Sequence, residues 1–435
     1  MAAAARGSSE NAQALHEMHK KLADLLNNEQ IRPVSLASDG TEVECQVQQL
    51  ITQSAPSHHI YSIGNTFLGD IGRITLRIPL FLGLYPTIIV QDSKHGRKTA
   101  RNQLFTGARI LVLGFFAAFF AQLRELAANA LGPLFMRDVE NVDRQDDRAA
   151  ARTFSASALD FHMKTYPDQR GLSVYLFVLG DLVDAWQNRN ISHHLRAKMV
   201  IRARFFLMAW RAHIVAHPDY SVNTQFISRE SFDIFLTLAE SLLSLMIIYR
   251  KYYSRYPLLP WLHSTEPCEH VFGVLRQIKK DFTFADMLFA QPKLQALLLG
   301  AFGDMTPEEQ ANQTASGYHH TYFKADDLDL EELMRYPTDD DLVAASDAAF
   351  KEAEQLLASV GINAEAMLKA PTGHTPVTKK KMKIRPAPES RGPQTLAEIL
   401  ALYQLPTSTN SKQMDTFEAC ELALVADNVD RSLAM

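Results

Sequence analysis

A long series of predicted helices limits which folds this chain can adopt. This series, the helical block, lies between two segments that contain candidate acidic site residues. Apolar residues recur at helical spacing over 94–125, 147–164, 172–187, 194–215 and 231–253. Pro257 and Pro260 close the block, because proline cannot continue a helix. The pattern predicts one helical unit of about 150 residues.

The segment before this block has the residue types of short strands. Val34 and Leu36 lie among small residues and predict a strand that ends at Asp39-Gly40. Residues 60–84 mix β-branched and aromatic residues with glycines, which indicates short strands and turns. Residues 87–90 (Thr-Ile-Ile-Val) predict a buried strand, with Asp92 just past its end.

The region after the block predicts further helices. One begins near Pro267, and an acidic, mainly helical region follows Phe302, with its clearest helix over 339–360. Residues 370–393 are basic and proline-rich, as in a linker, and 396–405 predict a short terminal helix. The sequence contains neither a phosphate-binding GxxxxGK[ST] loop nor a GxGxxG fingerprint.

Composition limits the compartment and the partners. The 435 residues have room for two or three domains, and a net charge of -5 gives no global bias toward nucleic acid. Any DNA contact must therefore come from local basic surfaces. Cys45, Cys268 and Cys420 are too far apart in sequence for a zinc motif or a disulfide framework, which favours a reducing compartment.

Membrane insertion is not expected. The most apolar run, 110–121, is shorter than the roughly 20 residues that a bilayer requires. Asp233 and Glu240 interrupt the apolar stretch 232–249, and the N-terminus lacks a secretory signal. We expect a nuclear or cytoplasmic protein that is neither secreted nor membrane-bound.

Asp39 and Asp92 are candidate metal ligands, and each also has a purely structural interpretation. Asp39-Gly40 is a common turn pair, because glycine accommodates positive φ, and local sequence alone favours the turn. Asp92 or Ser93 could cap the next helix. However, the first turn of that helix carries four basic side chains, which the helix dipole disfavours by roughly 0.3–1 kcal/mol each. A basic helix start makes sense if it faces phosphates while Asp92 holds a cation.

Glu269 is the third candidate, and its helix offers two interpretations. Pro267 suits the first turn of a helix, and Glu269, Gly273 and Arg276 share one face. Gly273 costs up to about 1 kcal/mol relative to alanine, which indicates a close approach near Glu269. The alternative is a solvated Glu–Arg face, with the glycine relieving helix packing.

These segments, taken in order, resemble the catalytic domain of P-element-like transposases, including THAP-associated relatives and similar sequences of mushroom-forming fungi. Residues 91–102 (QDSKHGRKTARN) resemble the family's D-x-x-H-x-x-K-x-x-R-N motif. Glu269, Phe272, Gly273 and Arg276 match its E-x-x-F-[SG]-x-x-R motif, and Ser38-Asp39-Gly40 is similar to its first-aspartate segment. The segments 143–155 and 184–189 resemble parts of the family's helical insertion.

The resemblance implies an α/β fold: an RNase H-like mixed-sheet core interrupted by a large all-α insertion, with a mainly helical C-terminal region. The implied division is an N-terminal tail (1–30), the first part of the core (31–105), the helical insertion (106–259) and the second part of the core (260–302). An acidic helical region (303–369), a basic linker (370–393) and a C-terminal tail (394–435) follow.

The resemblance also implies metal-dependent DNA strand cleavage and transfer. Asp39, Asp92 and Glu269 would be the catalytic residues and would bind Mg²⁺ or Mn²⁺, since carboxylates suit such ions. Two metal ions would hold the attacking and leaving oxygens of an in-line phosphoryl transfer. The phosphate-contacting residues would be His95, Lys98, Arg101, Asn102 and Arg276.

The sequence departs from the family pattern at its start. The residues before Asp39 contain no cysteine, so we expect DNA recognition to be lost or supplied by a separate DNA-binding subunit, and a homo-oligomer is compatible with this. A degenerate or domesticated copy is one outcome. An alternative is a catalytically inactive transposase-derived factor that binds DNA or protein. A third hypothesis is a purely helical scaffold, which requires residues 60–92 to be helical.

Several other segments could carry function. Residues 379–385 (KKKMKIR) could be a nuclear localisation signal or an ordinary solvated basic run. The pairs His193-His194 and His319-His320 look like metal ligands, but adjacent side chains point to different faces, which favours structural or surface roles. The aromatic stretch 249–261 could stack bases, although packing is the favoured role of most of its rings.

Overall fold

The computed structural model describes residues 11–81, 85–105, 109–140, 143–302 and 328–369. Long helices dominate this part of the chain, and the strands form three small sheets. The chain is therefore of mixed α/β class, as the sequence predicts.

The N-terminal part contains a parallel strand pair beside an antiparallel sheet. Its elements are α1 (Ala12–Asn28), β1 (Ser35–Ser38), α2 (Glu42–Ser54), β2 (Ser57–Ile63), η1 (Gly69–Gly72), β3 (Ile74–Phe81), β4 (Tyr85–Pro86) and β5 (Ile88–Gln91). β1 pairs with β5 in parallel, and β2, β3 and β4 pair antiparallel. Along β3, Ile74, Leu76 and Ile78 are buried and alternate with exposed residues, so one face of the sheet covers the core. These strands exclude the purely helical scaffold.

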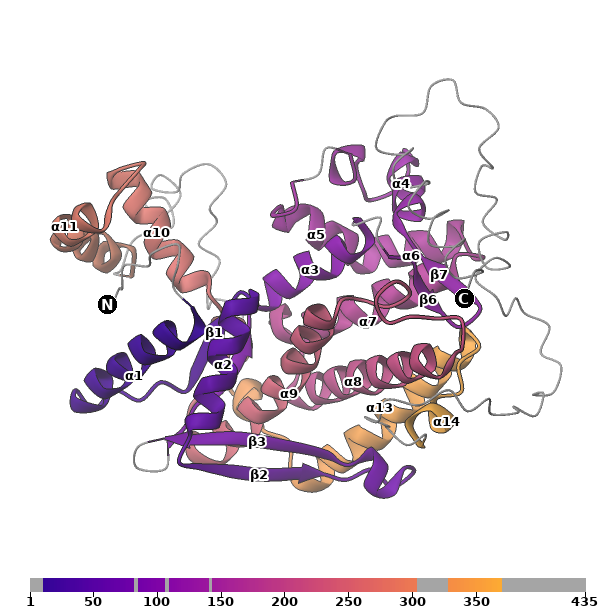
Figure 1. The fold of residues 1–435 in the computed structure, drawn as a ribbon, viewed down its shortest axis with the longest axis horizontal. Helices are drawn as coiled ribbons and strands as arrows, with labels where there is room; N and C mark the ends of the chain where they lie inside the picture. Colours follow the sequence, from indigo (N-terminus) through magenta and orange to yellow (C-terminus); the bar gives the residue numbers. More distant parts are fainter. Residues whose placement is uncertain (1–10, 82–84, 106–108, 141–142, 303–327, 370–435) are drawn as a thin grey trace.

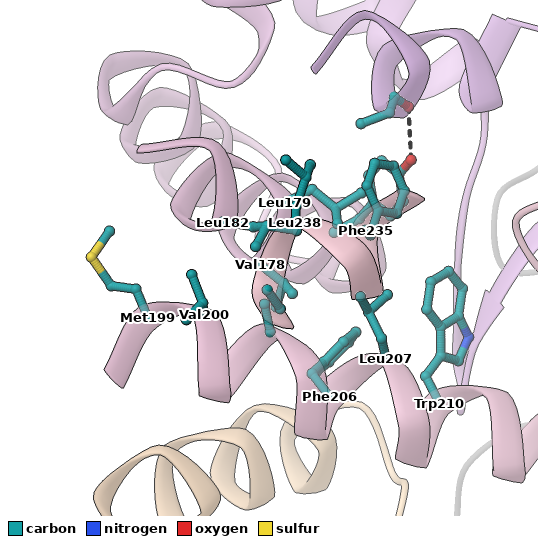
Figure 2. Close-up of a cluster of buried hydrophobic side chains, with 14 of the residues drawn as sticks. Val178, Leu179, Leu182, Met199, Val200, Phe206, Leu207, Trp210, Phe235 and Leu238 are labelled. Atoms are coloured by element: carbon teal, nitrogen blue, oxygen red, sulfur yellow. Dashed lines mark hydrogen bonds between the residues drawn. The ribbon is translucent and has the colours of Figure 1, made fainter. Parts of the chain in front are cut away.

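Packed helices form the centre of the molecule (Figure 1). They are α3 (Ser93–Phe105), α7 (Arg170–Gln187), α8 (His193–Ala216) and α9 (Arg229–Tyr252). α8 is buried along most of its length and packs against α7 and α9. Figure 2 shows Leu179 and Leu182 of α7, Phe206 of α8 and Leu238 of α9 in one apolar cluster.

The observed helices differ from the predicted ones in two places. The segment 94–125 contains a hairpin between two helices: β6 (Leu111–Leu113) and β7 (Phe116–Ala118) precede α4 (Phe120–Ala128). Gly114 turns the chain at φ 59°. The expected helix 147–164 is divided into α5 (Asp147–Thr153) and α6 (Ala156–Thr165), because Ser155 caps the second by accepting from Ala158 N. The segment 106–259 is therefore not entirely helical.

The C-terminal elements belong to two parts of the molecule. They are η3 (Pro260–Leu262), α10 (Glu266–Ile278), α11 (Phe284–Phe302), η5 (Glu332–Met334), α13 (Asp339–Ser359) and α14 (Ala364–Lys369), while η2 (Met136–Asp138) lies earlier, beside α4. α13 and α14 pack on the central helices, which we call the body, and α10 with α11 forms what we call the arm. α13 packs on α8 through buried residues such as Phe350 and Leu357 and so joins the core. α10 and α11 pack against each other and extend from the body (Figure 1).

Some predictions concern residues outside the described ones. They are the basic linker 370–393 with its run 379–385, the C-terminal tail 394–435 with the helix 396–405, and residues 303–327 of the acidic region with the pair His319-His320. Among the described helices, only α9 is long and apolar enough to cross a bilayer, and 78% of its most apolar window is buried inside the protein. Burial in a core accounts for that composition equally well.

Candidate functional site

Asp39 and Asp92 directly follow the carboxyl ends of two paired parallel strands, β1 and β5. Ser38 of β1 lies opposite Gln91 of β5 in parallel register, and Asp92 N donates to Ser38 O at 2.8 Å. Gly40 turns the chain at φ 80°, and a Cβ there would lie 2.8 Å from Ile234 Cδ1. Gly40 has the positive φ of the turn interpretation, but Asp39-Gly40 leads from β1 into α2 and forms no hairpin, because β1 pairs in parallel with β5. Asp39 lies beside the start of α3, with its Oδ1 3.7 Å from His95 Nε2.

Asp92 is a buried cap that joins α3 to α10. Its Oδ1 accepts from Lys94 N at 2.8 Å and from His95 N at 3.0 Å, which caps α3. Its Oδ2 accepts from the backbone N and from the hydroxyl of Thr265, each at 2.9 Å. The residue is only 2% exposed. Both carboxylate oxygens therefore have protein partners.

Asp39, His95 and Glu269 converge to form what we call the acid–histidine cluster. One ligand atom from each lies within 4.8 Å of the others. His95 Nε2 is 3.2 Å from Glu269 Oε1 and 3.7 Å from Asp39 Oδ1. Asp92 is not a member of this group. The structure thus brings two of the three predicted acids together, with a histidine between them.

Lys98 also reaches the histidine of the acid–histidine cluster. Its Nζ is 3.3 Å from His95 Nε2 and 3.4 Å from Asp147 Oδ1. A hydrogen on Nε2 would be donated to Glu269, whereas a bare Nε2 would accept from Lys98. The position of this one proton therefore determines which neighbour His95 binds.

Charges adjust the proton affinities within the acid–histidine cluster. Burial lowers the pKa of His95, but the hydrogen bond with Glu269 and the charges of Asp39 and Asp92 outweigh burial and Lys98, so the net pKa is raised. The hydrogen bond from His95 lowers the pKa of Glu269, against the opposing effect of burial. The protonated imidazole and the ionised carboxylate thus stabilise each other.

The donor set fits a divalent cation. Asp39 Oδ1 is buried and has no hydrogen-bond partner among the described residues, and leaving such an oxygen unsatisfied is costly. The side chains of Asp39 and Glu269 are 37% and 46% exposed, so an ion could enter from solvent. Two carboxylates with one imidazole suit Mn²⁺ better than Mg²⁺, which prefers oxygen ligands.

The five residues that were predicted to contact phosphates differ in burial and in hydrogen-bond partners. Arg101 is fully buried and donates to the carbonyls of Asp143 and Asp146, while Asn102 donates to Arg144 O. Both side chains therefore hold the loop before α5. Arg276 is exposed on α10, about 10 Å along the helix from Glu269. Among the five predicted contacts, Arg276 is the one whose side chain is open to solvent.

Sequence reasoning missed the contacts that anchor α10. Besides the bonds from Thr265 to Asp92, Lys94 Nζ forms an ion pair with Glu266 Oε2. The Asp92–His95 spacing carries one usable signal, because a cap and a residue three positions later share the first helical turn. Nothing in the sequence links Thr265 to Asp92, which lies 173 residues earlier.

The other candidate residues have structural surroundings. His193 is fully buried with Nε2 2.9 Å from Leu333 O, and its ring stacks on Tyr336. His194 is exposed beside Asp341, so the adjacent histidines do point to different faces. Within the aromatic stretch 249–261, Tyr249 packs edge-on against His263.

The comparisons with known proteins return one distant likeness. No protein-family model and no curated protein matches the sequence. Among solved structures, the chain is similar to the Drosophila P element transposase strand transfer complex, with a TM-score of 0.47 and 12% identity. The likeness covers 68% of this chain and 65% of that one, so this chain spans less than two thirds of its neighbour. A likeness this distant identifies neither the family nor the activity.

Proposed function

We propose that the chain is a transposase-like enzyme for metal-dependent cleavage and transfer of DNA strands. The observation that carries the proposal is the acid–histidine cluster, which joins Asp39 and Glu269 from opposite ends of the helical block. Two ionisable carboxylates, one of which has a buried oxygen without a hydrogen-bond partner among the described residues, suit a divalent-metal site.

The chain's own residues would divide the work. Asp39 and Glu269 would hold divalent ions, which supply Lewis-acid stabilisation of the attacking and leaving oxygens when bound. His95 would supply a third ligand atom to the same ion as a neutral imidazole, so metal binding would release its proton. Asp92 would act mainly by fixing α3 and α10 in position, and Arg276 would contact the DNA backbone from the arm.

The same proposal extends to the fold of the core, the partner and the location of the protein. The parallel β1–β5 pair, with an acid after each strand, supports an RNase H-like core formed by 31–105 and 260–302. The long helices α7, α8 and α9 support the inserted helical domain, with the β6–β7 hairpin as its one sheet element among the described residues. DNA is the proposed partner and the nucleus the proposed location. The assembly would be a homo-oligomer or a complex with a separate DNA-binding subunit.

One observation favours a second candidate, an inactive transposase-derived factor that binds DNA or protein. Both oxygens of Asp92 are taken by four protein donors. Releasing this carboxylate to a metal would leave several of those donors unpaired, at a cost of about 1–3 kcal/mol each. In this candidate the fold persists, while the third acid serves only as a cap.

Nicking of supercoiled plasmid DNA tests the two candidates. The wild-type chain should nick with Mn²⁺ or Mg²⁺, and Glu269→Gln should abolish nicking without unfolding the protein. Asp70→Asn is the matched control, because Asp70 is an exposed acid on η1. Undiminished nicking by Glu269→Gln would end the enzyme proposal. DNA binding without nicking by the wild-type chain would support the inactive factor.

A further inference from the structure

A cavity lies at the opposite end of the parallel strands from the acid–histidine cluster. It has a volume of about 280 Å³, close to the lower end of the range for ligand pockets. Residues of α1, of the segment 31–36 and of the end of α2 line it, together with Phe81, Tyr85 and Thr87. Leu36 of β1 and Thr87 before β5 line it, whereas Asp39 and Asp92 follow the other ends of these strands.

The interior of this cavity is apolar. Ile51 of α2, which is 1% exposed, contributes to its wall together with Leu36 and Phe81. Apolar surface left against water is unfavourable by roughly 25 cal/mol per Å². An occupant with an apolar body would therefore gain affinity from the wall alone.

Cationic side chains line the same cavity. Arg32 lies over the ring of Tyr85 at 3.5 Å and forms no ion pair with a described carboxylate. Lys20 contributes a second cation, although its Nζ also donates to Glu17 at 3.2 Å. Asp24 is the one carboxylate among the lining residues. The balance of charge complements an anion.

A buried polar atom without a partner adds a second, independent observation. His16 lines the cavity and is only 4% exposed, and its Nδ1 has no hydrogen-bond partner among the described residues. Burial and the charge of Lys20 lower the pKa of His16, which favours the neutral ring. A neutral imidazole can donate to or accept from a ligand without adding charge.

We propose that this cavity binds a small amphiphilic carboxylate, an aromatic or medium-chain aliphatic acid. The carboxylate would pair with Arg32 and Lys20 and accept a hydrogen bond from His16 Nδ1, and the apolar body would lie against Leu36 and Ile51. The proposal is independent of the DNA chemistry, because none of these residues belongs to the acid–histidine cluster.

Isothermal titration calorimetry of the full chain with decanoate tests the proposal, with decanol and decylamine as neutral and cationic probes of equal length. Decanoate should bind at least tenfold more tightly than either. Arg32→Gln should remove at least tenfold of its affinity, and Ala23→Phe, which fills the cavity, should abolish binding. Arg229→Gln is the matched control, since that side chain is 87% exposed on α9.

Three outcomes would overturn this assignment. They are no decanoate binding by the wild-type chain, decylamine binding as tightly as decanoate, and unchanged affinity in Arg32→Gln. Circular dichroism of each variant separates loss of the pocket from loss of the fold. Binding that survives Ala23→Phe in a folded protein would place the probe elsewhere and would also contradict the proposal.

Discussion

At the scale of single residues, Asp39 and Asp92 occupy equivalent positions after paired strands but have different surroundings. Asp92 accepts four hydrogen bonds and is buried, whereas Asp39 Oδ1 has no hydrogen-bond partner among the described residues. The first arrangement is expected of a structural carboxylate and the second of a ligand. Stability measurements can distinguish these roles without any assay of activity.

Asp92→Ala should lower the free energy of unfolding by at least about 2 kcal/mol, because the variant loses a helix cap and the bonds to Thr265. Asp39→Ala should change it by less than about 1 kcal/mol, since it loses no hydrogen bond and only a partly exposed charge contact with His95. Urea denaturation measures both. A large loss in Asp39→Ala, with none in Asp92→Ala, would reverse the assignment of roles.

His193 should make the protein sensitive to mild acid. Burial lowers the pKa of His193 to about 4, from 6.5 for an unperturbed histidine. Between these values the unfolded chain binds a proton that the folded chain excludes, so the free energy of unfolding falls as pH falls from about 6.5 to about 4. His193→Gln should reduce this slope. Equal slopes in the wild type and His193→Gln would contradict the prediction.

The candidate site could be predicted from the sequence in its parts but not in its contacts. Strand-end positions and the motif spacing identified Asp39, Asp92 and Glu269 as candidates. The partner of each acid depends on how α10 meets α3, and that contact joins residues more than 170 positions apart, such as Thr265 and Asp92. Local patterns contain no information about such a pair.

At the scale of secondary-structure elements, periodicity predicted the long helices and failed on short apolar runs. α7, α8 and α9 agree closely with the predicted segments, because each repeats its pattern over several turns. The run 110–121 became β6 and β7, since a short, wholly apolar segment has no period that separates strand from helix. The division between α5 and α6 depends on one cap, Ser155.

The turn between β6 and β7 gives one test at this scale. A Cβ on Gly114 would lie 1.9 Å from Val360 O, and Phe115 N donates to the same oxygen at 2.8 Å. Gly114→Ala should therefore lower the free energy of unfolding by more than the roughly 1–2 kcal/mol of a left-handed residue alone. Thermal unfolding checks this. A neutral effect would mean that the hairpin does not sit against the end of α13.

The helix α13 gives a second test. Leu357 is fully buried against the core, so Leu357→Ala should cost about 2–5 kcal/mol of unfolding free energy. The exposed neighbour in Gln355→Ala should have little effect. Chemical denaturation measures both. Equal effects would show that α13 folds apart from the body.

At the scale of the whole molecule, one apolar core extends from the sheet through α7, α8 and α9 to α13. α13, from the acidic region 303–369, therefore packs in the same core as α8, from the segment 106–259. α10 and α11 extend from this body, and α10 reaches the strand ends through Thr265, Glu266 and Glu269. The acid–histidine cluster thus forms where the arm meets the body.

Electron paramagnetic resonance tests most directly whether the acid–histidine cluster is a metal site. The signal of free Mn²⁺ decreases as the protein binds the ion, so the decrease measures binding. The wild-type chain should bind Mn²⁺, and Asp39→Ala and Glu269→Gln should each weaken binding at least tenfold, while Asp70→Asn should bind as the wild type does. A wild-type chain that leaves the signal unchanged, or an Asp39→Ala variant that binds equally well, would contradict the account.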